Sequence, residues 1–116
     1  MTASVAEGLA ARIAAVLAID PSAGAIESQG SWCSWGQLAE TADQVAARIE
    51  RPGTEVGVVL RNRPASVATI LGVLQAGGCV VTINPGRGAD RTREDLAALD
   101  LPLVIGEPDD LAEMLP

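Results

Sequence analysis

The chain has 116 residues, of which 48% are hydrophobic, and this is enough for one folded domain with a core. Eight basic residues stand against fifteen acidic ones, and the net charge of −7 disfavours nucleic acid and anionic lipid as partners. Neither lysine nor histidine occurs, which excludes a lysine Schiff base, a histidine-based triad and a histidine metal site within this chain.

The first predicted element is an amphipathic helix within an N-terminal unit, residues 1–21. Its apolar residues recur at helical spacing: Val5, Leu9, Ile13, Val16 and Leu17. No basic segment leads the stretch, and its apolar run over 13–19 is shorter than the about 20 residues that span a bilayer. We therefore expect no transmembrane segment and a cytoplasmic location.

A short hairpin and a second helix are predicted next. Residues 25–27 and 31–33 flank Gln29-Gly30, a turn pattern. Over 34–49, Ser34 can cap the helix by accepting from the N–H of Gln37, whose side chain reaches back to the Ser34 N–H. Cys33 and Leu38 are spaced as a hydrophobic staple. One face is apolar: Leu38, Ala42, Val45 and Ile49.

The rest of the second unit, residues 22–116, alternates strands and helices. Apolar runs at 55–60, 79–83 and 101–106 predict buried strands. The helix between the first two has the apolar stripe Val67, Ile70, Leu71 and Leu74, and a helix over 89–100 turns Leu96 and Leu99 inward. We predict an α/β fold: a small parallel β-α-β-α-β sheet flanked by helices.

This predicted sheet is incomplete. Two crossover helices leave an edge and part of a face uncovered, although parallel sheets are normally covered on both sides. The closing stretch, residues 107–116, has Pro108 in the first turn of another predicted helix. We therefore expect a partial α/β subdomain of something larger.

The loop at residues 84–88 is the candidate binding site. It lies between a predicted parallel strand and a helix, where backbone N–H groups and Arg87 can hold an anion. Pro85 removes one donor, however, and the spacing matches neither known glycine-rich phosphate pattern. We favour a tight turn in which Gly86 and Gly88 take positive φ, and keep as the alternative an anion site formed by Asn84, Gly86, Arg87 and Gly88.

Two further charged groups have structural alternatives that we favour. Arg61 and Arg63 follow a strand end, where ligands of α/β folds bind, but Asn62 can cap the next helix while both arginines are solvated or pair with acidic residues. Asp109-Asp110 suggests a magnesium site less strongly than a helix start. We therefore predict no catalytic residue and no metal site in this chain.

The aromatic and sulfur residues also have structural interpretations. Trp32 and Trp35 bracket a helix cap and are expected to pack or to line an interdomain seam. Cys33 and Cys79 have no C-x-x-C spacing and are expected to be buried free thiols.

Three stretches in order resemble a known family: "SWGQLAETADQVAARI", "VGVVLRNRPASVATILGVLQAGG" and "CVVTINPGRG". Together they are similar to the N-terminal part of the adenylate-forming superfamily, specifically AMP-dependent acyl-CoA synthetases acting on fatty or aryl acids. The match covers about residues 24–106, and the ordered combination carries it.

The resemblance implies activation of a carboxylic acid, here expected to be a fatty acid, by ATP and Mg, followed by transfer to coenzyme A. The family's phosphate-binding run ending in Pro-Lys and its catalytic lysine are absent from this sequence. We therefore expect a structural segment that is inactive alone, binds no cofactor itself and has the remainder of the ligase or a second copy as its partner.

Two alternatives stay open. The chain can be a self-contained α/β dimerisation or binding module without catalysis, with its open sheet edge covered by the N-terminal helix or by a symmetric partner. An independent nucleotide-binding domain that uses the loop at 84–88 is the weakest interpretation, because fold class alone does not establish a ligand.

Overall fold

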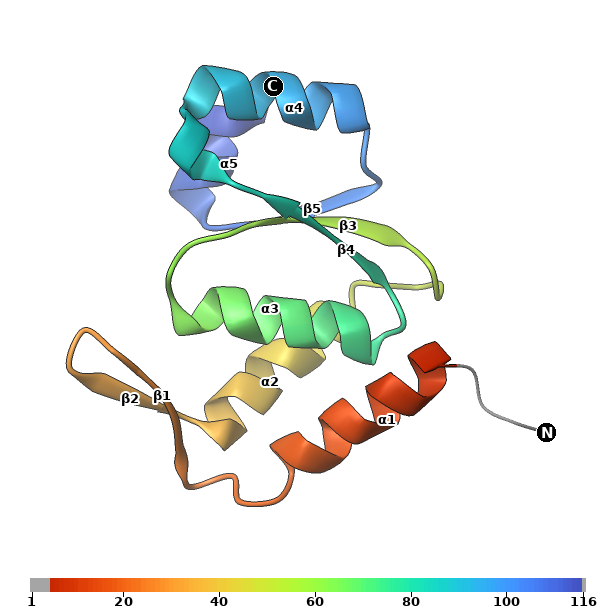
Figure 1. Cartoon of the computed structure of the whole chain (residues 1–116), viewed down its shortest axis with the longest axis vertical. Coiled ribbons are helices and arrows are strands. Elements are labelled where there is room, and N and C mark those ends of the chain that lie inside the picture. The colour runs from red at the N-terminus through yellow and green to blue at the C-terminus, as the bar shows by residue number, and fades with distance from the viewer. Residues whose placement is uncertain (1–4, 116) are drawn as a thin grey trace.

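The helices and strands follow the predicted order. The computed structural model describes residues 5–115, so residues 1–4 and 116 of the two predicted units lie outside it, and the division between the units stays a prediction. Figure 1 shows the elements α1 (Val5–Leu17), β1 (Gly24–Ser28), β2 (Ser31–Ser34), α2 (Trp35–Ala46), β3 (Glu55–Val59), α3 (Pro64–Gln75), β4 (Cys79–Ile83), η1 (Pro85–Arg87), α4 (Ala89–Leu99), β5 (Leu103–Ile105) and α5 (Pro108–Met114).

A parallel sheet with the strand order β4-β3-β5 forms the centre of the molecule. Val56 of β3 pairs with Val80 of β4 and with Leu103 of β5. Residues 56–59 are all buried, as a continuous apolar run predicts for a strand covered on both faces. The predicted parallel β-α-β-α-β sheet with flanking helices is confirmed.

Helices lie on both faces of this sheet. Figure 1 shows α3, backed by α2, on one face and α4 with α5 on the other. The buried residues of the first face are Val45, Val56, Val58 and Val73, and those of the second are Val59, Ile83, Leu96 and Met114. Among the described residues β4 and β5 have no outer strand neighbour, and β5 is only half-buried. The expected open edge and partial cover are therefore present.

The hairpin forms where the sequence predicts it. β1 and β2 pair antiparallel, and the turn residues Gln29 and Gly30 both have positive φ. Glycine adopts this backbone region without strain, which explains why Gly30 marks the turn. In Figure 1 the hairpin projects from the side of the molecule.

The capping box at the start of α2 is confirmed. The Gln37 N–H donates to Ser34 Oγ at 3.1 Å, and the Ser34 N–H donates to Gln37 Oε1 at 2.9 Å. The buried face consists of the predicted residues Leu38, Ala42 and Val45. The helix ends at Ala46, earlier than the predicted end at residue 49, although Ile49 still packs against the core.

The buried face of α3 differs from the prediction. The expected stripe is Val67, Ile70, Leu71 and Leu74, whereas the buried residues are Ala68, Thr69, Gly72 and Val73. Val67 is exposed. The reason is that α3 lies between the sheet and α2, and the close approach of α2 requires small side chains along the contact. Of the predicted stripe, Ile70 and Leu71 flank this contact and are half-buried against the core clusters.

Three other expected burials are also wrong or incomplete. Leu99 is 47% exposed because it lies in the last turn of α4, while Leu96 one turn earlier is buried. Cys79 is exposed at the start of an edge strand, and Cys33 is half-buried against the α2 cluster. Both thiols are free, as predicted, but neither is fully buried.

The described part of the chain is flat, with extents of 44 × 41 × 19 Å. Its radius of gyration is 14.9 Å. A compact domain of this length is expected to have a radius of about 13 Å, so the fold spreads more than a closed globule does. Among residues 5–115, no helix has both the length and the apolar character needed to cross a membrane.

Candidate functional site

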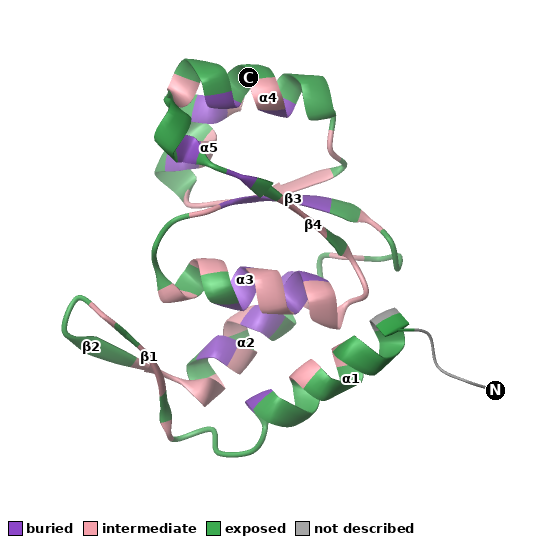
Figure 2. Ribbon diagram, in the orientation of Figure 1, coloured by how far each residue is buried: buried purple, intermediate pink, exposed green. Residues whose placement is uncertain are grey.

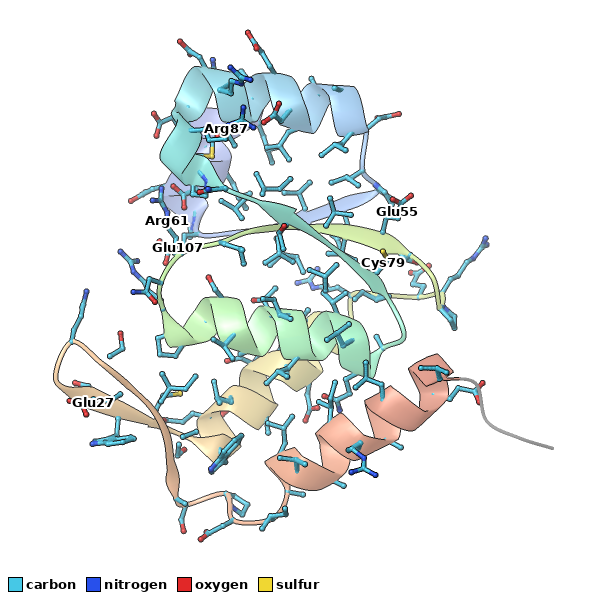
Figure 3. The ribbon with its side chains drawn as sticks, in the orientation of Figure 1. Glu27, Glu55, Arg61, Cys79, Arg87 and Glu107 are labelled. Carbon is cyan, nitrogen blue, oxygen red and sulfur yellow. The ribbon has the colours of Figure 1, made fainter. Side chains whose placement is uncertain are left out.

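The carboxyl edge of the sheet gathers the charged residues that follow the three parallel strands. Because the strands run in the same direction, the segments after Val59, Ile83 and Ile105 emerge at one edge. Figure 3 shows Arg61, Arg87 and Glu107 at this edge and Glu55 with Cys79 at the opposite one. This edge is where α/β folds commonly bind ligands, so its contacts decide what the chain can do.

Two ion pairs join the β3–α3 loop to the start of α5, and the Arg61–Asp110 pair is bidentate. Arg61 Nε donates to Asp110 Oδ2 at 2.8 Å, and its Nη2 donates to Oδ1 at 2.6 Å. Arg63 Nη1 donates to both carboxylate oxygens of Glu107, at 2.6 and 2.8 Å. The two parallel N–H···O bonds of the Arg61–Asp110 pair fix geometry as well as adding energy. The arginines therefore hold α5 across the edge of the sheet.

The Arg61–Asp110 pair is the more buried of the two ion pairs. The Asp110 side chain is only 8% exposed, whereas that of Arg61 is 39% exposed. The hydrogen bond from Arg61 lowers the pKa of Asp110, against the opposing effect of burial, and the same bond raises the pKa of Arg61. Both groups therefore stay charged around neutral pH.

This arrangement confirms the pairing of Arg61 and Arg63 with acidic residues. The expected cap by Asn62 is wrong, because Arg63 occupies the N-cap position of α3 without a side-chain cap bond. Asp110 faces an arginine, while its neighbour Asp109 is exposed. Residues 5–115 contain no group of three or more side chains suited to hold a metal ion.

The loop after β4 is tied by its own hydrogen bonds. Asn84 Oδ1 accepts from the N–H of Gly86 at 3.0 Å, and the N–H of Gly88 donates to the carbonyl of Pro85 at 3.1 Å. Only Gly88 has the expected positive φ, at 99°, because Gly86 lies within a 3-10 turn. Arg87 Nη1 lies 3.7 Å from a carboxylate oxygen of Asp95.

These contacts fit a turn better than an ATP phosphate cradle. Two N–H groups that would face an anion are already donated within the loop, and Arg87 has a carboxylate neighbour. Anion binding by Asn84, Gly86, Arg87 and Gly88 stays a prediction.

Two shallow clefts flank the carboxyl edge. One, of about 240 Å³, lies between the start of α3 and the end of β5, and the other, of about 370 Å³, lies between the end of β4 and α4. In the first, Ser66 Oγ accepts from the Arg61 N–H and Thr69 Oγ1 donates to the carbonyl of Ala65. Each of these hydroxyls thus already has one hydrogen-bond partner within the fold.

The two tryptophans lie outside this edge. Trp32 is 63% exposed on the hairpin, with its ring over Gly24, where a Cβ would come within 2.8 Å of Trp32 Cε3. Trp35 packs against the core cluster that contains Leu17 and Leu38. The two residues therefore have different roles, and only Trp32 presents a free aromatic surface.

Sequence comparison finds a match to one protein family. A model of the AMP-binding enzyme family matches residues 13–115. The nonribosomal peptide synthetase atnA of Emericella nidulans is 30% identical over 95 residues, which are 78% of this chain and 1% of that protein.

Solved structures show the same fold. The nonribosomal peptide synthetase FmoA3, in an AMPPNP-bound form, has a TM-score of 0.78 at 27% identity over 93% of this chain and 12% of that chain. A benzoate CoA ligase from Burkholderia xenovorans LB400 has a TM-score of 0.73 at 19% identity over 90% of this chain and 22% of that chain. The chain thus spans a small part of each relative and corresponds to a fragment of an adenylating domain.

Proposed function

Because the chain belongs to the AMP-binding enzyme family, we propose that it is a structural segment of a domain that activates a carboxylic acid with ATP. Its role is to supply three parallel strands and their covering helices, on which the rest of an adenylation site is assembled. The observation that carries this proposal is the family match over 13–115, combined with a structural likeness that covers 12% of FmoA3.

The chemistry of the chain supports a scaffold role. The sequence has no lysine, so the catalytic lysine implied by the family resemblance has to be supplied from outside this chain. The charged side chains at the carboxyl edge are paired with one another: Arg61 with Asp110 and Arg63 with Glu107. We propose that ATP, Mg and coenzyme A, where used, are held by residues outside this chain.

For the substrate we propose only its chemical class, a carboxylic acid. The relatives described above are two peptide synthetases and a benzoate CoA ligase, and none of these names refers to a fatty acid. A fatty acid with transfer to coenzyme A remains the narrower proposal. An amino acid substrate is the competing one, favoured by the peptide synthetases.

A segment exchange tests the scaffold proposal. Residues 13–115 replace the equivalent segment of FmoA3, and ATP–pyrophosphate exchange is measured with the acid that FmoA3 uses. We expect exchange within about tenfold of FmoA3, equivalent to about 1.4 kcal/mol of transition-state stabilisation. The same chimera with Arg87→Ala should exchange equally well, because the loop at 84–88 acts as a turn.

A folded chimera without exchange activity would contradict a purely structural role, and loss confined to Arg87→Ala would locate an anion site at the loop. Circular dichroism and thermal unfolding show whether each chimera is folded.

A second candidate, a self-contained dimerisation module, is favoured by the open edges of β4 and β5 among the described residues. It predicts a stable dimer of the 116-residue chain and an inactive chimera.

A further inference from the structure

We draw no further inference here: the strongest candidate, the exposed apolar face of α1 formed by Val5, Leu9 and Val16 (Figure 2), carries none, because the chain spans only 12% of FmoA3 and nothing in the structure of residues 5–115 shows what covers this face.

Discussion

Replacing Gly72 by leucine is expected to lower the free energy of unfolding by about 3 kcal/mol, because α3 has no room for a side chain there. A Cβ at Gly72 would lie 2.5 Å from the carbonyl oxygen of Ala42 and 2.8 Å from Val45 Cβ. The Ala42 oxygen belongs to the backbone of α2, so the helices have to separate. Urea unfolding followed by circular dichroism measures the loss.

Gly8→Leu is the matched control for this prediction. Gly8 also lies inside a helix, but a Cβ there would meet nothing within 4 Å. Leucine is a better helix former than glycine, so this variant should gain up to about 0.8 kcal/mol. Equal effects at both positions, in either direction, would show that helix propensity and not the α2–α3 contact decides the outcome at Gly72.

Asp110→Asn is expected to lower the free energy of unfolding by about 1–2 kcal/mol at neutral pH. Breaking a fully buried ion pair costs about 3–5 kcal/mol, but the exposed part of Arg61 regains hydration, so the smaller figure applies here. Asp109→Asn, in the same turn of α5, should change stability little, because Asp109 is exposed. Thermal and urea unfolding of both variants provide the comparison.

The pH dependence of this pair has a defined direction. Folding lowers the pKa of Asp110, chiefly through the hydrogen bond from Arg61, so the folded state holds its proton less tightly than the unfolded state. The stabilisation is therefore complete above the usual aspartate pKa and is lost as pH falls through the lower folded value. The difference between the wild-type chain and Asp110→Asn should shrink below about pH 4. A constant difference down to about pH 2 would contradict the assigned role.

Elements specified by local chemistry could be predicted from the sequence. The Ser34–Gln37 capping box fixes the start of α2 through bonds between residues three apart, and Gln29-Gly30 places the hairpin turn by backbone preference. Strand β3 is predictable from its short apolar run, because a run of this length is typical of a strand covered on both faces. In each case the determining contact lies within a few residues of the chain.

Features that depend on how elements pack could not be predicted in the same way. The burial of Gly72 rather than Leu71 follows from the proximity of α2, which helical periodicity does not contain. The exposure of Cys79 follows from the position of β4 at the sheet edge, and strand order is a tertiary property.

At the candidate site, too, the charged residues could be predicted from the sequence but their pairing could not. The sequence marks Arg61 and Arg63 as charged residues after a strand, but it does not pair them with Asp110 and Glu107, which lie 49 and 44 residues away. The sequence does contain a signal for this pairing, because parallel strands bring the segments after β3 and β5 to one edge of the sheet. Acidic residues directly after the third strand are then the nearest partners for these arginines.

If this chain supplies structure to an adenylation domain, as we propose, it should not itself hold the nucleotide. Isothermal titration of the full chain with Mg-ATP tests it most directly, with light scattering on the same sample to fix the molar concentration of the binding species. We expect no saturable binding at micromolar strength. Saturable micromolar binding would contradict it, and loss of that binding in Arg87→Ala would identify the loop at 84–88 as the nucleotide site.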